Sequence, residues 1–211
     1  NSGRKDMAFI VTTLMVIFSA ITATVTTIFA GGLSDKLGKR KPFVSYGYIV
    51  WGITIMLFAA IPMKVSAGSL AIIGFLLVLF DCIMTLAGST ANDAAFNAWI
   101  TDVTDDTNRG RVNTVLSILP VFATVIVFIG LGSLYNSKSD DNRLFFIVLG
   151  LIPVIFGIIA VFVMKDSPSV VKNANPDYLK ETFYGFRKDV IKENKMLYVC
   201  LFAICFLGIS Q

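Results

Sequence analysis

The chain has 211 residues, of which 55% are hydrophobic and only 15% are charged, whereas a soluble domain carries about 25% charged residues. This composition predicts an all-α, polytopic membrane protein, and the net charge of +4, concentrated in loops, indicates membrane lipid rather than nucleic acid as a partner. The absence of histidine excludes a histidine metal site or proton relay, and three cysteines in apolar stretches indicate neither a disulfide framework nor a cysteine-rich metal site.

Apolar segments recur along the whole chain. A helix needs about 20 apolar residues to cross a hydrocarbon core of about 30 Å. In chain order, the predicted spans are Met7–Leu33, Pro42–Met63, Ser69–Ile100, Val112–Tyr135 and Leu144–Met164. A sixth apolar segment, Met196–Gln211, has only sixteen residues, and the chain begins with Asn1 rather than methionine. We therefore expect the chain to be part of a longer protein.

Lysine and arginine are distributed unequally when alternate loops are assigned to opposite sides of the membrane. Thirteen of them lie in the loops 34–41, 101–111 and 165–195, and five lie on the other side. Because cytoplasmic loops carry the excess of positive charge, these three loops are predicted to be cytoplasmic. We expect an integral protein of the plasma (inner) membrane.

The loop between the first two spans reads G-G-L-S-D-K-L-G-K-R. Its charged side chains must lie in water or pair, because hydrocarbon offers neither. Its glycines allow a tight turn and close approach of two helix ends. The residues concerned are Gly31, Asp35, Lys36, Gly38, Lys39 and Arg40. The pattern G-x-x-x-D-K-x-G-K-R resembles the helix 2–helix 3 loop of the major facilitator superfamily of secondary transporters, although the positive-inside rule alone also accounts for a basic loop.

This resemblance implies a numbering for the spans. A transporter of the superfamily starts in the cytoplasm, so one helix is expected to precede Asn1, and helix 1 and the C-terminal half are expected partners of this chain. The expected units are helices 2 to 6 in 1–164, a cytoplasmic linker in 165–195 and the start of helix 7 in 196–211. In the linker, Leu179, Phe183, Phe186 and Val190 recur on one helical face, which predicts an amphipathic helix on the membrane surface.

The third span carries the polar groups that predict a transport site. They recur at every fourth residue, as Asp81, Thr85, Ser89, Asp93, Asn97 and Thr101. Each step rotates by about 40°, so Asp81 and Asp93 are expected about 120° apart. Asp81 is predicted close to the bilayer midplane, where a carboxylate costs about 3 kcal/mol unless it pairs, protonates or meets water. The alternative is a buried carboxylate satisfied by a Lys, an Arg or a hydroxyl of a neighbouring helix.

Positions 92–112 read N-D-A-A-F-N-A-W-I-T-D-V-T-D-D-T-N-R-G-R-V. This stretch resembles the helix 4–helix 5 region of the glycoside–pentoside–hexuronide:cation symporters. The resemblance implies that Asp93 takes part in cation and sugar binding, and it matches Asp105 and Arg109 to the family's loop. The sequence departs from the family at two acids, a sugar-stacking tryptophan and a sugar-binding arginine, whose positions hold Ala23, Thr27, Asn97 and Ser117. Neither sugar as substrate nor sodium as coupling ion follows from such a match.

We predict a secondary active transporter that works by alternating access and couples a sugar or similar small solute to Na⁺ or H⁺, with no resident cofactor. Substrate or cation contacts are assigned to Asp81, Ser89, Asp93 and Asn97. The alternatives are a relative that moves lipid-like or other organic solutes, and a membrane scaffold or receptor subunit without transport. An enzyme is not predicted, because no nucleophile–base pair or metal cluster appears at the membrane face.

Gating is assigned to the two predicted cytoplasmic loops that follow the first and third spans. The gating residues are Gly31, Asp35, Lys36, Gly38, Lys39, Arg40, Asp105 and Arg109. The basic residues of 36–41 are expected to meet Asp102, Asp105 and Asp106. Asp35 is expected to pair with Arg109 or Arg111, or to lie at a helix N-terminus in the other half of the transporter.

Overall fold

The computed structural model describes residues 2–61, 69–135, 142–167 and 183–209, and all regular structure in these ranges is helical. The α-helices are α1 (Ser2–Leu37), α2 (Lys41–Leu57), α3 (Leu70–Gly88), α4 (Asn97–Val103), α5 (Arg109–Ile126), α6 (Arg143–Val163), α8 (Lys188–Glu193) and α9 (Lys195–Ile209). Two π-helical stretches, η3 (Ser89–Phe96) and η4 (Val127–Leu131), and three short 3₁₀ turns, Phe58–Ala60, Gly132–Leu134 and Tyr184–Phe186, continue or connect them. The expected all-α fold is confirmed.

Five helical stretches are long and apolar enough to cross a membrane. They are Asp6–Leu37, Lys41–Ala60, Leu70–Val103, Arg109–Leu131 and Arg143–Val163. The five predicted spans are therefore confirmed, with shifted ends. The third stretch has 34 residues because α3, η3 and α4 follow one another without a break.

The first connection is shorter than the loop predicted from hydropathy. Helix α1 continues through Asp35 and Lys36 to Leu37, and Gly38 ends it with a φ of 62°. That conformation is readily available only to glycine, and the Gly38 N–H donates to the Asp35 carbonyl at 3.1 Å. The turn predicted at Gly38 is confirmed. At Gly31, a Cβ would meet nothing within 4 Å, so no close helix approach is seen there among the described residues.

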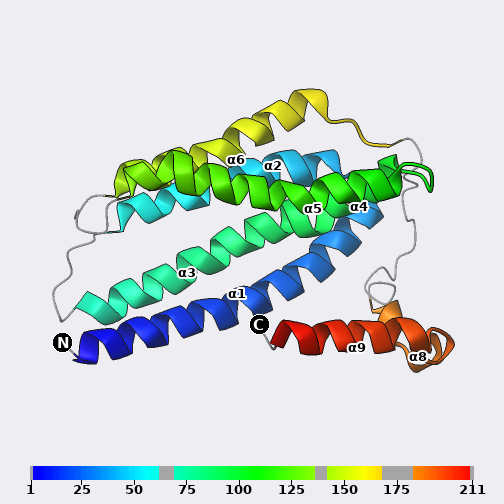
Figure 1. Ribbon diagram of the computed structural model, residues 1–211, viewed down its shortest axis with the longest axis horizontal. Coiled ribbons are helices and arrows are strands. Elements are labelled where there is room, and N and C mark those ends of the chain that lie inside the picture. Colours follow the sequence, from blue (N-terminus) through cyan, green and yellow to red (C-terminus); the bar gives the residue numbers. More distant parts are fainter. Residues whose placement is uncertain (1, 62–68, 136–141, 168–182, 210–211) are drawn as a thin grey trace.

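Four of the spans pack side by side in the order α1, α3, α2, α6 (Figure 1). Helices α2 and α6 are antiparallel and touch through their backbones. A Cβ added at Gly52 would overlap the Gly150 carbonyl, and one at Gly157 would lie 2.8 Å from the Ser45 carbonyl. Such small residues let two membrane helices approach closely where lipid supplies no hydrophobic drive. Helix α5 buries none of its residues against the other described elements.

The predicted amphipathic linker helix lies mostly outside the described residues, because 168–182 are not described. Its last part differs from the prediction. Residues Tyr184–Phe186 form a 3₁₀ turn, and Arg187 is extended with a ψ of 140° before α8 begins. The helix therefore does not run unbroken from Phe183 to Val190.

Candidate functional site

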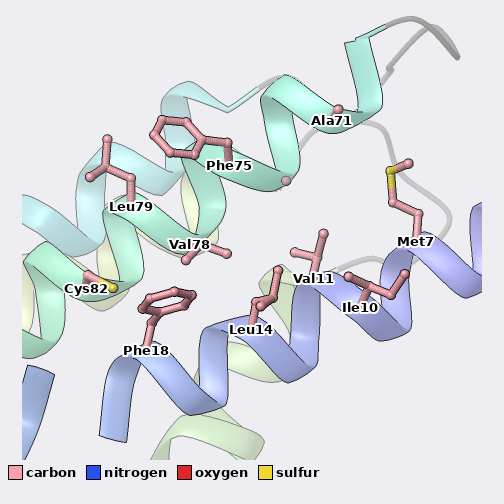
Figure 2. A pocket seen from close by; sticks show the side chains of 11 residues that line it. Met7, Ile10, Val11, Leu14, Phe18, Ala71, Phe75, Val78, Leu79 and Cys82 are labelled. Atoms are coloured by element: carbon pink, nitrogen blue, oxygen red, sulfur yellow. The ribbon is translucent and has the colours of Figure 1, made fainter. Parts of the chain in front are cut away.

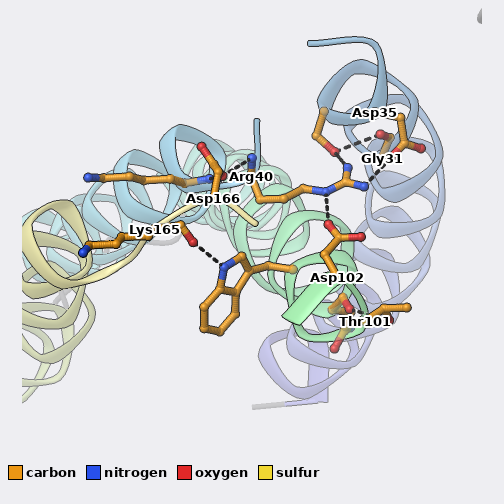
Figure 3. Close-up of polar contacts among 11 residues, drawn as sticks. Gly31, Asp35, Arg40, Thr101, Asp102, Lys165 and Asp166 are labelled. Atoms are coloured by element: carbon orange, nitrogen blue, oxygen red, sulfur yellow. Dashed lines mark hydrogen bonds and ion pairs between the residues drawn. The ribbon is translucent and has the colours of Figure 1, made fainter. Parts of the chain in front are cut away.

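The end of the bundle that is predicted to be cytoplasmic is organised around Arg40. Its side chain ion-pairs with Asp35 of α1 and donates from Nε to Asp102 of α4 at 3.0 Å (Figure 3). Its other arm donates to the Ser34 hydroxyl, which donates to the Gly31 carbonyl at 2.9 Å. Arg40 is only 6% exposed, so this guanidinium is a buried charge with two carboxylate partners.

Asp166 closes the same cluster from the end of α6. One carboxylate oxygen accepts from the backbone N–H groups of Arg40 and Lys41, both at 2.7 Å (Figure 3). These N–H groups belong to the first turn of α2, where a negative charge also stabilises the helix dipole. Next to it, the Trp99 indole donates to the Lys165 carbonyl at 2.9 Å. We call Asp35, Arg40, Asp102 and Asp166 the charge cluster.

Burial on its own lowers the pKa of Arg40, but the hydrogen bonds to Asp102 and Asp35 outweigh it. The net result is a pKa above the ordinary value for arginine. Arg40 therefore stays charged at any physiological pH. The cluster joins α1, α2, α4 and the end of α6 within one bundle.

The predicted pairing of the two loops is confirmed for Arg40 with Asp102, whereas the partner predicted for Asp35 is wrong. Asp35 pairs with Arg40 rather than with Arg109 or Arg111. The reason is the reach of Arg40, whose fork takes both nearby carboxylates. Lys39 is exposed and Lys36 is half-buried.

Asp105 and Arg109 instead order the turn between α4 and α5. The Asp105 carboxylate accepts from the Thr107 N–H at 2.9 Å, the Thr107 hydroxyl at 2.5 Å and the Asn108 N–H at 3.1 Å. The hydroxyl bond is the largest of the causes that lower the pKa of Asp105. Arg109 donates to Thr104 and lies 3.8 Å from Asp106. Neither residue reaches the charge cluster.

Asp81 lies inside the seam between α1 and α3 and is 8% exposed. Ser19 of α1 donates to its carboxylate at 2.8 Å, and the Ser19 and Thr85 hydroxyls are 2.7 Å apart. Within the described residues, no Lys or Arg pairs with this carboxylate. The neutral alternative, a hydroxyl on a neighbouring helix, is thus the contact observed. Ser19 was not among the predicted site residues.

Asp93 lies in the π-helical stretch η3 and is exposed. Tyr48 of α2 donates to Asn92 Oδ1 at 2.9 Å, and Asn92 Nδ2 donates to Asp93 Oδ1 at 3.1 Å. Asn97 is also exposed and donates to the Asp93 carbonyl at 3.2 Å. The structure therefore brings Asp93 and Asn97 together, adds Tyr48 and Asn92 to them, and leaves Asp81 elsewhere.

The two acids lie on opposite sides of the middle of their span. Asp81 follows Leu70 by eleven residues, or about 17 Å of helix, and Asp93 precedes Val103 by ten residues, or about 15 Å. Asp81 was predicted to lie close to the bilayer midplane. Because the helix continues beyond Ile100 to Val103, the middle of the span lies between Asp81 and Asp93 instead. Ser89 lies between the acids and is buried. In the part of the chain that the structure describes, no group of three or more His, Cys, Asp or Glu is arranged to hold a metal ion.

Comparison with known proteins gives one family. The family model described as Major Facilitator Superfamily matches residues 6–211. No curated protein and no solved structure matches the chain significantly.

Proposed function

The chain belongs to the major facilitator superfamily and is a membrane transporter rather than an enzyme, and we propose that it is a symporter that couples a small organic solute to Na⁺ or H⁺. Alternating access in such proteins is rocking of one half against the other around a site near the midplane. The described helices are then helices 2 to 6, with 165–195 as the linker and 196–211 as the start of helix 7. Loops 34–41, 101–111 and 165–195 face the cytoplasm in this proposal, and the membrane is the plasma (inner) membrane.

The observation that carries the proposal is the state of Asp93. Its carboxylate is exposed, lies about 15 Å inside its span and forms no ion pair within the described residues. A carboxylate at such depth costs about 3 kcal/mol unless it binds a cation, protonates or meets water. In a transporter, Asp93 can meet a cation, a proton and water, because an aqueous path reaches the site from one side of the membrane at a time.

The neighbours of Asp93 fit a site that changes its charge. Asn92 and Asn97 supply amide groups that donate or accept equally well, and Tyr48 fixes the amide of Asn92 from the adjacent helix. Carboxylate and amide oxygens are suitable ligands for Na⁺, and the same carboxylate takes up H⁺. Asp93 is therefore the proposed coupling residue, with Asn97 on the substrate path.

The exposed part of the charge cluster is the proposed gate. Asp35 remains 56% exposed although it pairs with Arg40, and Lys36 and Lys39 lie in the same turn. Asp35 and Lys39 are exposed and can meet the second half of the transporter in this proposal, whereas Arg40, Asp102 and Asp166 hold the first half together. Exposed pairs contribute about 0–1 kcal/mol each, which is enough to bias two conformations of similar energy.

A sugar is the first substrate class to test, on the resemblance of positions 92–112 alone. The second candidate, an apolar or lipid-like organic solute, is favoured by an observation. Trp99, the nearest tryptophan to Asn97, stacks on Phe96 at 6.0 Å and donates to the Lys165 carbonyl. Trp99 therefore packs at the end of the helix and does not replace the sugar-stacking tryptophan whose position holds Asn97.

The test is uptake in proteoliposomes by the chain together with the helices proposed to complete the transporter, screened over sugars and apolar solutes with an imposed Na⁺ or pH gradient. Asp93→Asn should abolish the gradient dependence of uptake. Asp106→Asn is the matched control, because Asp106 is fully exposed in the α4–α5 turn. Normal gradient-driven uptake by Asp93→Asn would refute the coupling assignment. Absence of uptake of every solute, under both gradients, would favour the scaffold alternative.

A further inference from the structure

The third span has different surroundings on its two sides. Toward α1 it borders a groove of about 520 Å³ lined by apolar and sulfur side chains, with Leu14 of α1 and Phe75 of α3 among its walls (Figure 2). Toward α2, in contrast, the π-helical stretch η3 meets a polar group, because the Tyr48 hydroxyl donates to Asn92 Oδ1 at 2.9 Å. The polar contact closest to Asp93 therefore comes from α2.

The backbones of α2 and η3 are close together at Gly47. A Cβ added there would lie 2.7 Å from the Ala91 Cβ and 3.2 Å from the Ala91 Cα, and Ala91 is fully buried. Two membrane helices come this close only where the side chains between them are small. Because Tyr48 follows Gly47 and Asn92 follows Ala91, this contact sets the distance between the phenol and the amide.

The Tyr48 ring also packs against Trp51, one turn later in α2. The two ring centroids are 5.6 Å apart. A Cβ added at Gly88, the residue before η3, would lie 3.1 Å from the Trp51 ring, so this ring rests on the start of η3. The phenol is thus held at η3 by contacts that do not involve Asp93.

Asn92 connects this phenol to Asp93. Its Oδ1 accepts from Tyr48, and its Nδ2 donates to Asp93 Oδ1 at 3.1 Å. An amide turned the other way would present its oxygen to the carboxylate, and two acceptors repel each other. Without the Tyr48 hydroxyl, the amide has one partner instead of two in its observed orientation. It is then free to rotate away from Asp93.

We propose, on the basis of the transport function above, that Tyr48 is a positioning residue for Asp93. Acting through Asn92, it holds Asp93 Oδ1 toward α2 and leaves Oδ2, which accepts no hydrogen bond in the part of the chain that the structure describes, to the coupling ion. Tyr48 itself contacts neither ion nor solute. Loss of its hydroxyl should therefore weaken ion binding without slowing the maximal rate of transport.

The experiment is infrared difference spectroscopy of ¹³C-aspartate-labelled protein in lipid, on the chain together with the helices proposed to complete the transporter. The Asp93 band is identified as the band that Asp93→Asn removes. Tyr48→Phe should shift this band, because the stretching frequency of a carboxyl group depends on its hydrogen bonds. An unshifted band in Tyr48→Phe overturns the proposal.

Tyr46→Phe is the matched control, because it makes the same chemical change on the same helix at a ring that is 62% exposed. It should leave the Asp93 band in place, and an equal shift in both variants overturns the proposal. A double-mutant cycle then tests the route through Asn92. In an Asn92→Ala background, Tyr48→Phe should produce no further shift, whereas a further shift would show that Tyr48 does not act through Asn92.

Uptake in proteoliposomes gives the functional measurement. Tyr48→Phe should raise the Na⁺ or H⁺ concentration for half-maximal uptake by about fivefold, the effect of one hydrogen bond, and should keep the maximal rate within about twofold. A lower maximal rate at an unchanged half-saturating concentration contradicts a positioning role.

The two measurements separate this proposal from the transport function. A shifted Asp93 band in Tyr48→Phe, together with no gradient-driven uptake by the wild type, keeps the Tyr48–Asn92–Asp93 contact and removes the transport function. Coupled uptake that depends on Asp93, together with an unshifted band, keeps the transport function and removes the role of Tyr48.

Discussion

Two buried ionisable side chains, Arg40 and Asp81, have opposite surroundings. Arg40 meets two carboxylates and is 6% exposed, whereas Asp81 accepts from the Ser19 hydroxyl, which also bonds to Thr85, and is 8% exposed. Both occupy contacts between helices. The two side chains are about equally buried, but only Arg40 has partners of opposite charge. The fold therefore neutralises the charge of Arg40 and does not neutralise that of Asp81.

The comparison assigns different roles to the two ends of the bundle. A buried charge whose partners are all present stabilises one arrangement of helices, and its loss leaves those partners unpaired. A carboxylate that accepts only a hydroxyl hydrogen bond gains less stabilisation from the fold than one paired with a cation, and it can still bind a cation or a proton. The charge cluster is therefore structural at Arg40, and the membrane-spanning acids are the residues for which we propose a transport role.

Arg40→Ala should produce the largest effect. It removes the buried cation that Asp35 and Asp102 share and should lower the free energy of unfolding by about 3 kcal/mol. The measurement is the thermal unfolding midpoint of the purified protein, followed by tryptophan fluorescence. Arg109→Ala is the control, because its ion pair with Asp106 is 3.8 Å long and exposed and should be worth about 0.5 kcal/mol or less.

The same measurement on Asp81→Asn completes the comparison. The amide oxygen still accepts from Ser19, and no counter-charge is left behind, so stability should change by about 1 kcal/mol or less. Equal losses in Arg40→Ala and Asp81→Asn would show that the two buried charges are used in the same way.

Hydropathy predicts the spans because it reports where a helix enters hydrocarbon. It does not report where the helix ends, and for this reason the first helix was expected to end at Leu33 and continues to Leu37. Asp35 and Lys36 fit a helix that extends into water. The end itself is set by the positive φ of Gly38, which the glycine in the loop motif indicated.

Contacts in the candidate site were predictable only where the charges of two residues and the side of the membrane on which they lie were enough to pair them. Arg40 and Asp102 have opposite charges on loops predicted to lie on one side, so their pairing followed. The bond between Ser19 and Asp81 depends on the register of α1 against α3, which no local pattern fixes. The π-helical stretch around Asp93 has no residue signature either, although such stretches are frequent at functional sites.

Asp166 was missed, although it is the first acid after the last apolar residues of its span. Asp166→Ala removes the acceptor for two N–H groups at the start of α2 and should destabilise the protein by about 1 kcal/mol. Asp166→Asn keeps an acceptor oxygen and should lose less. Unfolding midpoints compare the two variants with wild type, and equal losses would mean that the charge rather than the hydrogen bonds stabilises this end.

The smallest effect is expected at Asp105, outside the cluster. Its folded-state pKa is lowered, chiefly by the Thr107 hydroxyl, so its contribution to stability is present above the ordinary value of 3.8 and is lost as pH falls through the lower folded value. Thr107→Val removes that donor and should raise the pKa of Asp105 toward the ordinary value. The measurement is a pH titration of ¹³C-labelled aspartate carboxyl signals by NMR, with the Asp105 signal assigned from Asp105→Asn.

Thr114→Val is the matched control for this titration, because the Thr114 hydroxyl donates to the Gly110 carbonyl of its own helix and does not contact Asp105. An Asp105 titration that moves equally in both variants would show that the turn rather than the hydroxyl sets its pKa. Since Asp105 is exposed to solvent, the effect on unfolding should be smaller than in any cluster variant. A loss as large as that of Asp166→Ala would extend the structural role of the charge cluster into the α4–α5 turn, which the contacts of Asp105 do not predict.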